Sequence, residues 1–168
     1  MLMKKTNALV VSVLLLILPV FSAFAARKAA VRTGIEVLEE RGFAGLVGKR
    51  VGLVTNPSGI DRNLRSTIDI LYEAPGVELV TLFAPEHGVR GDAYAGDKVA
   101  DTVDPKTGVK VYSVYGKTRM PSQEMLDGLD VVVYDIQDVG TRSYTFISTL
   151  GLMMRACAMK EIEVMVLD

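Results

Sequence analysis

Short apolar runs rich in β-branched residues alternate along this chain with segments of helical periodicity, and this alternation limits the folds available to it. Five of these runs have the length of strands, at residues 50–55, 77–83, 109–114, 131–134 and 162–167. They are nearly continuous apolar stretches, which is typical of strands covered on both faces. The pattern predicts an α/β domain with a parallel sheet of about five strands and helices on both faces.

The intervening helices are predicted from their capping residues and their apolar faces. Thr33 stands at the start of a short helix with capping-box spacing. Asp61 is expected to cap a second helix, whose apolar side chains lie between residues 64 and 71, and a third helix is expected at residues 143–159. Residues 84–108 show no convincing period, so the sequence predicts a long loop there.

Three polar loops are expected to meet at one edge of the predicted sheet. Ligands of open α/β sheets bind in the crevice beyond the carboxyl ends of the strands. The loops that follow the first, second and fourth predicted strands, at residues 56–61, 84–96 and 135–144, should therefore face one crevice. These loops are also the ones richest in reactive side chains, so we expect the functional site there.

The first 25 residues have the organisation of a secretory signal peptide. Two lysines form the positive n-region, an apolar run extends from Ala8 to Phe21, and the tripeptide that ends at Ala25 fits the small-x-small cleavage pattern. The apolar run is shorter than the ~20 residues that a membrane-spanning helix needs. We therefore expect cleavage after Ala25, a short linker at residues 26–33, one domain at residues 34–168, and a periplasmic or secreted protein with no stable membrane anchor.

Residue counts and missing motifs exclude several classes of site. The chain has one histidine and one cysteine, so a site built on two or three histidines and an intrachain disulfide are both impossible. No glycine-rich dinucleotide fingerprint follows the first strand and no Walker A lysine motif is present, so neither a cofactor nor a metal is expected. The net charge is −1 with no long basic stripe, which argues against nucleic acid as a partner.

The loop after the second predicted strand carries Glu86 and His87 between Pro85 and Gly88. A carboxyl group at the mouth of a crevice, beside the low-dielectric sheet, has the surroundings that a general acid needs. The neighbouring imidazole is able to hydrogen-bond a substrate. The alternative is a plain turn in which Glu86 accepts a backbone amide and His87 is merely exposed. The spacing of these residues leaves both interpretations open.

The loop after the fourth predicted strand supplies two more carboxylates, Asp135 and Asp138, on either side of Gln137. Glycosidases usually combine two carboxyl groups, one as acid and one as base or nucleophile. Glu86 with either aspartate could form such a pair. The alternative is that one aspartate caps the next helix and the other pairs with Arg142.

Other polar side chains in these loops suit the binding of a sugar. Arg142 and Tyr144 begin the last predicted helix, where they could hydrogen-bond a sugar carboxylate or hydroxyl. Asn56 and Ser58 follow the first strand and are weaker candidates, because most Asn-Pro sequences simply form turns. The ordinary alternative for Arg142 and Tyr144 is surface exposure.

Four ordered segments resemble the DUF1343 family, which is associated with the NamZ-type exo-β-N-acetylmuramidases. They are Val54–Gly59 (VTNPSG), Phe83–Gly91 (FAPEHGVRG), Thr107–Gly116 (TGVKVYSVYG) and Asp135–Thr149 (DIQDVGTRSYTFIST). The resemblance covers essentially all of residues 34–168. It implies a Rossmann-like N-terminal domain that carries the active-site cleft. It also implies an exo-acting glycoside hydrolase that releases N-acetylmuramic acid from the non-reducing ends of peptidoglycan fragments.

Carried over by motif, the resemblance implies that Glu86 is the catalytic acid and that His87 and Asp138 support it. It implies substrate binding by Asn56, Arg90, Asp135, Gln137, Arg142 and Tyr144. The expected partners are muropeptides or disaccharides derived from peptidoglycan. Members of the family continue beyond the match to Asp168 with an Arg-Pro-Asn-Pro block and a second domain, so we expect this chain to lack the C-terminal domain. The alternatives are a non-catalytic module that binds cell-wall sugars and an inactive truncated remnant.

Overall fold

The computed structural model describes residues 31–91, 94 and 101–167. The chain divides into two units, Met1–Val31 and Arg32–Asp168, and the description below concerns the second unit. The predicted signal peptide at residues 1–25 lies outside the described residues. Within the described ranges, no helix combines the length and the apolar character that a membrane span requires.

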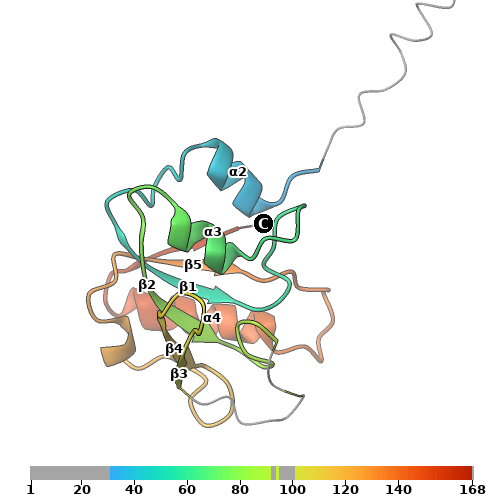
Figure 1. Cartoon of the computed structure of the whole chain (residues 1–168). Coiled ribbons are helices and arrows are strands. Elements are labelled where there is room, and N and C mark those ends of the chain that lie inside the picture. Colours follow the sequence, from blue (N-terminus) through green and yellow to red (C-terminus); the bar gives the residue numbers. More distant parts are fainter. Residues whose placement is uncertain (1–30, 92–93, 95–100, 168) are drawn as a thin grey trace, which may run out of the picture. The chain divides into compact units, whose positions relative to one another are not determined.

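A six-stranded sheet forms the centre of the second unit (Figure 1). The strand order is β3-β4-β2-β1-β5-β6, and every neighbouring pair is parallel except β3 with β4. The strands are β1 (Arg50–Thr55), β2 (Glu78–Ala84), β3 (Thr102–Val103), β4 (Lys110–Ser113), β5 (Val131–Asp135) and β6 (Glu163–Val166). The predicted α/β class and the five predicted parallel strands are confirmed, and the sheet has a sixth strand, β3, which pairs antiparallel with β4. The additional strand, β3, lies within the region predicted as a loop, and its two exposed residues are too few to show a period.

The parallel strands extend from β1 in both directions. β2 and β4 lie on one side of β1, and β5 and β6 lie on the other. The chain therefore leaves the carboxyl ends of β1 and β5 in different directions, and this is the topological switch point where ligands of doubly wound sheets bind. The loops that begin at Asn56 and Ile136 start at this point.

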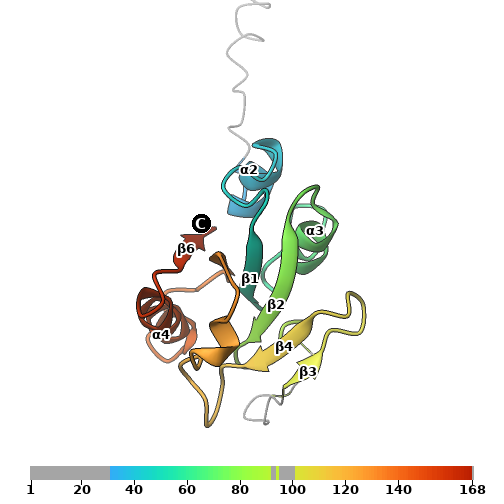
Figure 2. The ribbon, with the colours of Figure 1, turned by 90° about the vertical axis from the view of Figure 1, so that its left-hand side faces the viewer.

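Helices cover both faces of the sheet, and Figures 1 and 2 show α3 and α4 on opposite sides of it. One core contains side chains of α2 (Gly34–Glu40) and α3 (Thr67–Glu73). The other contains side chains of α4 (Phe146–Ala158) and of the 3₁₀ turn η1 (Glu124–Leu126). Successive residues of a strand point to opposite faces, so Leu53 belongs to the first core and Val54 to the second. Burial on both faces explains why the strands have nearly continuous apolar sequences.

The helix predicted after Asp61 begins later than expected. The Asp61 carboxylate accepts two backbone N–H groups within its own turn, the closer from Arg65 at 2.7 Å. In this turn, Leu64 has 76% of its surface exposed and a φ of 63°. The prediction that Leu64 begins the apolar face of the helix was therefore wrong. Helix α3 begins after Ser66, whose hydroxyl accepts the Ile68 N–H. Bonds from an aspartate side chain to nearby backbone favour such a turn over a helix.

Candidate functional site

Glu86 lies in a tight turn that follows β2 directly. The Gly88 N–H donates to the Pro85 carbonyl oxygen at 3.1 Å, which closes the turn. His87, at its third position, has a left-handed backbone with a φ of 73°. Glycine usually occupies this position, so a histidine here carries a cost in backbone strain. The turn holds Glu86 and His87 side by side, both partly buried.

The Glu86 carboxylate is held by a tyrosine from the neighbouring strand. The Tyr115 hydroxyl, just beyond β4, donates to Glu86 Oε1 at 2.7 Å. The carboxylate stabilises the protonated phenol and so raises the pKa of Tyr115 above its ordinary value. Among the described residues, the hydrogen bond to the Glu86 side chain comes from Tyr115 and from no backbone amide of its own turn, which differs from the plain-turn interpretation. Sequence reasoning missed Tyr115, although its place after a predicted strand at the same sheet edge was a usable signal.

A cavity of about 550 Å³ opens beside this turn. Its volume lies within the usual range for small-molecule sites. The rings of Tyr144 and Phe146 meet edge to face with their centroids 6.1 Å apart and give it an aromatic wall. The described residues that line the cavity come from the loop after β1, the turn after β2 and the segment leading into α4: Asn56, Pro57, Ser58, Glu86, His87, Ser143, Tyr144, Thr145 and Phe146.

A chain of hydrogen bonds joins the loops on the two sides of the switch point. The Gln137 backbone N–H donates to Ser58 Oγ at 2.9 Å. Ser58 in turn donates to Asn56 Oδ1 through its hydroxyl at 2.6 Å and through its backbone N–H at 2.9 Å. Asn56 is only 8% exposed. The loop after β5 thus fixes the position of the asparagine that lines the cavity.

Two glycines permit the close approach of these loops. A Cβ at Gly91, where φ is 79°, would lie 2.7 Å from Pro57 Cγ. A Cβ at Gly59 would lie 2.2 Å from Thr55 Oγ1 and 2.8 Å from the backbone oxygen of Asp135. All three distances are shorter than a carbon atom tolerates, so a side chain at either position would push the loops apart.

Asp135 is a buried carboxyl group that supports the site and is not among the residues lining the cavity. It is 2% exposed, and its carboxylate accepts a hydrogen bond from the hydroxyl of Thr67 at the start of α3. Its backbone oxygen accepts the Thr55 hydroxyl at 2.8 Å. Burial raises the pKa of Asp135 to about 6, against the opposing effect of the Thr67 bond. Asp135 therefore links β5, β1 and α3 at the switch point.

Replacing Asp135 with asparagine is expected to raise the free energy of unfolding above that of the wild type. This difference between the two proteins should increase by about 2 kcal/mol from about pH 4 to about pH 8. The folded-state pKa of Asp135 is raised, so the protonated carboxyl group stabilises the folded state. This contribution is complete only below the pKa that Asp135 has in the unfolded state. That contribution is lost as the pH rises through about 6. Asparagine keeps the shape, does not ionise and accepts the Thr67 hydroxyl. Urea unfolding across this range measures the difference, with Asp138→Asn as an exposed control, and a pH-independent difference would contradict the argument.

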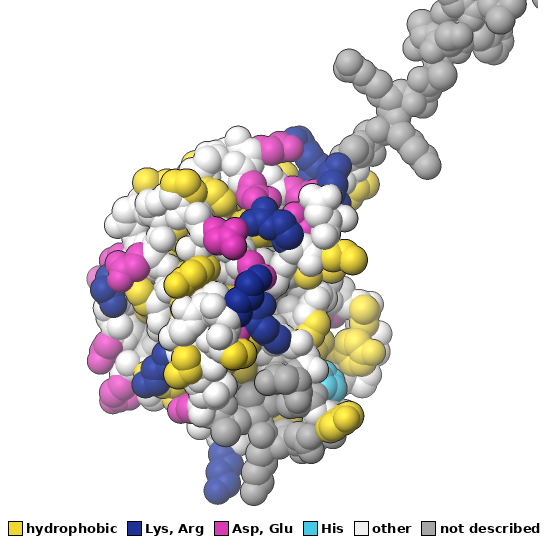
Figure 3. Space-filling model, in the orientation of Figure 1, with side chains coloured by type: hydrophobic (Ala, Val, Ile, Leu, Met, Phe, Trp, Pro, Cys, Tyr) yellow, Lys and Arg dark blue, Asp and Glu magenta, His cyan; other side chains and the backbone are white. Residues whose placement is uncertain are grey.

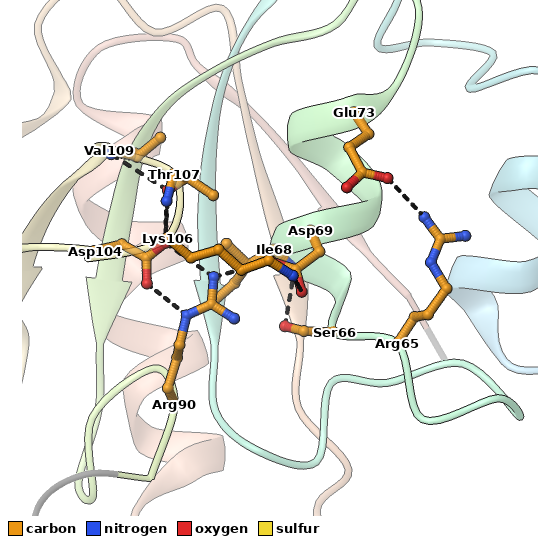
Figure 4. A network of polar contacts seen from close by, with 10 residues as sticks. All are labelled: Arg65, Ser66, Ile68, Asp69, Glu73, Arg90, Asp104, Lys106, Thr107 and Val109. Carbon is orange, nitrogen blue, oxygen red and sulfur yellow. Dashed lines mark hydrogen bonds and ion pairs between the residues drawn. The ribbon is translucent and has the colours of Figure 1, made fainter.

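Arg90 also lies outside the described cavity lining, and Figure 4 shows its guanidinium between two carboxylates. Nη2 donates to Asp104 Oδ2 at 2.9 Å and to Asp69 Oδ1 on α3 at 3.0 Å. Lys106 Nζ makes a second ion pair with Asp69 at 2.6 Å. Hydrogen bonds from Arg90, and then from Thr107, hold the pKa of Asp104 at about 2. Arg90 thereby ties the segment after the Glu86 turn to α3 and to the segment before β4.

Charged side chains of both signs are interspersed on the face of the molecule drawn in Figure 3. Among the described residues, oppositely charged side chains form ion pairs, such as Arg62 with Glu36 and Arg65 with Glu73. This face therefore presents no concentrated positive charge for an anionic polymer.

The remaining predicted site residues lie on an exposed loop outside the described lining of the cavity. Asp138 Oδ1 accepts the Gly140 N–H at 2.7 Å, and the side chains of Gln137 and Arg142 are exposed. In the described part of the chain, no hydrogen bond or ion pair joins Asp138 to Arg142. Helix α4 starts at Phe146 and not at residue 143, so Tyr144 reaches the cavity from a loop.

Of the predicted site residues, the structure brings Asn56, Glu86, His87 and Tyr144 together around one cavity. Sequence reasoning missed its other contributors, Pro57, Ser143, Thr145 and Phe146, and gave Ser58 little weight. No group of three potential metal-binding side chains occurs among the residues that the structure describes.

Comparisons with known proteins identify relatives of this chain. The family model described as "Exo-beta-N-acetylmuramidase NamZ, N-terminal" matches residues 51–168. The chain is 54% identical over 143 residues to the peptidoglycan beta-N-acetylmuramidase NamZ of Bacillus subtilis (strain 168). That match covers 85% of this chain and 34% of the Bacillus protein.

Two solved structures of DUF1343 family proteins from Bacteroides fragilis NCTC 9343 have similar folds. Their TM-scores are 0.75 and 0.67, and their sequence identities are 58% and 34%. Each match covers 82% of this chain and 34% of the solved chain, so the chain spans about a third of the length of these relatives. On the family model and these relatives together, the chain belongs to the NamZ (DUF1343) family, in which it matches the N-terminal domain.

Proposed function

We propose that this chain forms the catalytic N-terminal domain of an exo-acting glycoside hydrolase that releases N-acetylmuramic acid from the non-reducing ends of peptidoglycan fragments. The observation that carries the proposal is the position of Glu86 and His87 on the cavity, with Glu86 oriented by Tyr115. A relative that is 54% identical over 143 residues is named a peptidoglycan beta-N-acetylmuramidase. Muropeptides or disaccharides are the proposed substrates, and export to the periplasm or the medium belongs to the same proposal.

In the proposed mechanism, Glu86 is the general acid. Its proton passes to the glycosidic oxygen as the bond from that oxygen to the anomeric carbon breaks, so the leaving sugar departs as a neutral alcohol. Tyr115 occupies Oε1, which leaves Oε2 as the oxygen that carries the proton toward the substrate. His87, beside it on the cavity, hydrogen-bonds the sugar.

The second carboxylate is proposed to be Asp138. It acts either as the base that takes a proton from the water attacking the anomeric carbon, or as the nucleophile that bonds to this carbon until water hydrolyses the glycosyl intermediate. Glu86 is the one carboxylate among the described residues that line the cavity, and Asp135 is buried against Thr67. Asp138 lies on the exposed loop that leads to the lining residues Ser143 and Tyr144. In a substrate complex, a separation of about 5–5.5 Å between the two carboxyl groups corresponds to retention, and one of about 6.5–9.5 Å to inversion.

The second candidate function is a module that binds cell-wall sugars without cleaving them. The aromatic wall of Tyr144 and Phe146 favours it, together with the amide of Asn56, which Ser58 orients. An aromatic face and a few oriented polar groups are sufficient to bind a sugar without any acid chemistry.

The nature of the products separates the two functions. The chain is incubated with a peptidoglycan glycan labelled at its reducing end, and the products are followed by chromatography and mass spectrometry. We expect one N-acetylmuramic acid to be released from each glycan that ends in it, so that the labelled glycan becomes one residue shorter at its unlabelled end. Saturable binding without any product would favour the binding module, and cleavage at internal bonds would contradict the exo-acting mode.

A further inference from the structure

We propose that Ser58 holds the side-chain amide of Asn56 in one orientation, so that Asn56 Nδ2 donates a hydrogen bond to an acceptor oxygen of the sugar in the cavity. This inference rests on the proposed function and deepens it. Asn56 Nδ2 is then the atom that recognises a carbonyl, carboxylate or hydroxyl oxygen of the sugar. Ser58 is a positioning residue, because it acts through Asn56.

The hydrogen-bond directions in the network determine how the amide is turned. A backbone N–H only donates, so the Asn56 atom that lies 2.9 Å from the Ser58 N–H has to be the carbonyl Oδ1. The Gln137 N–H also only donates, and at 2.9 Å it occupies an acceptor position of Ser58 Oγ. The Ser58 hydroxyl hydrogen is then directed to Asn56 Oδ1, 2.6 Å away. The flipped amide would place its NH₂ group against the Ser58 N–H and is excluded.

The remaining polar atom of this side chain, Nδ2, is accessible, and it belongs to a residue that lines the cavity. Asn56 lines the cavity and is 8% exposed. No described residue accepts a hydrogen bond from Nδ2. Every buried side-chain nitrogen and oxygen of the described residues has a partner, so Nδ2 belongs to the accessible part of Asn56. A donor that its network already orients loses little conformational entropy when it binds a ligand.

N-Acetylmuramic acid presents three kinds of acceptor oxygen to such a donor. These are the acetamido carbonyl, the carboxylate of the lactyl ether and the ring hydroxyls. Glu86 and Asn56 lie on different segments of the cavity lining, so the same sugar can be held by the amide and protonated by the carboxyl group. The donor then contributes to affinity and to the choice of sugar, and it contributes little to the bond-breaking step.

Replacing Asn56 with aspartate tests the donor directly. A carboxylate still accepts both hydrogen bonds from Ser58 but has no hydrogen to donate. We expect Kd for N-acetylmuramic acid, measured by calorimetry, to rise about ten-fold or more. The KM for a muropeptide should rise by the same factor with kcat nearly unchanged. Asn63→Asp, which makes the same change at an exposed position, is the matched control and should bind as the wild type does.

Two variants of Ser58 test the positioning role. Ser58→Ala removes the hydroxyl that joins Gln137 to Asn56, and Ser58→Thr keeps it. In Ser58→Ala, Kd should rise about three-fold or more above the wild-type value, which is less than the rise in Asn56→Asp. Ser58→Thr should bind as the wild type does. If both variants lose binding equally, or neither does, the positioning role is wrong.

Ligand analogues identify the acceptor oxygen. The loss of affinity in Asn56→Asp should disappear with muramic acid, which has a free amine, if the acceptor is the acetamido carbonyl. It should disappear with N-acetylglucosamine if the acceptor is the lactyl carboxylate. A loss that persists with both ligands assigns a hydroxyl.

An NMR measurement on the wild-type chain tests the inference without depending on whether any variant folds. Titration with N-acetylmuramic acid should shift the NMR signals of the Asn56 side-chain NH₂ group. Binding that leaves these signals unmoved, or a Kd that is unchanged in a folded Asn56→Asp variant, overturns the inference alone. A wild-type chain that binds none of the three sugars overturns the proposed function and the inference with it.

Discussion

Replacing Glu86 with glutamine is expected to slow the hydrolysis of a muropeptide by about 10²- to 10⁴-fold, which is the usual contribution of a positioned general acid. Glutamine has the same shape, and its carbonyl oxygen accepts the Tyr115 hydroxyl in place of Oε1. The turn after β2 is therefore expected to keep its geometry while losing the proton that the leaving sugar needs. The rate of N-acetylmuramic acid release at saturating substrate measures the effect.

The choice of leaving group separates an acid from a residue that only shapes the cavity. An aryl glycoside whose phenolate departs without a proton should lose far less activity in Glu86→Gln than the muropeptide does. Glu161→Gln, the same change at an exposed position, should leave both rates unaltered. Equal losses on the two substrates, or wild-type turnover of the muropeptide, would contradict the assignment of Glu86 as the acid.

Replacing Arg90 with alanine is expected to lower the free energy of unfolding by about 3–5 kcal/mol, the usual result of removing one partner of a buried ion pair. The side chain of Asp104 has no exposed surface, and Arg90 is its cationic partner. Asp69 retains Lys106, so the loss comes chiefly from the uncompensated charge on Asp104. Urea unfolding of the chain measures it.

The pH dependence of this loss identifies its cause. The folded-state pKa of Asp104 is about 2, so the ion pair stabilises the protein above the unfolded-state pKa and ceases to do so as the pH falls through about 2. The difference between Arg90→Ala and the wild type should therefore shrink as the solution is acidified from about pH 5 toward pH 2. Arg41→Ala at an exposed position should change stability by no more than about 0.5 kcal/mol. A loss in Arg90→Ala that stays constant with pH would assign the effect to packing instead.

The parallel strands were predictable because their signal is local. Each of the five apolar runs agrees with a strand to within one residue at either end, since a strand buried on both faces has to be apolar throughout. β3 carried no such signal, because two exposed residues become a strand only by pairing with β4. Between Asp61 and Leu64 the sequence predicted a helix that the structure does not have. A helical period was present there, but hydrogen bonds from nearby backbone N–H groups to the Asp61 side chain stabilise a turn instead of a helix.

The sequence by itself determined the fold class, the sheet edge that carries the polar loops and the motif around Glu86. Only the tertiary structure decided which of the polar residues share a cavity. Glu86 and Tyr115 are 29 positions apart, and Ser58 and Gln137 are 79 apart. Asp135 is the counterexample, because it ends β5 at the edge that carries the polar loops and yet its carboxylate turns toward Thr67 on α3. Periodicity reports how one segment is buried, whereas these partners meet only because the strand order places their loops at one switch point.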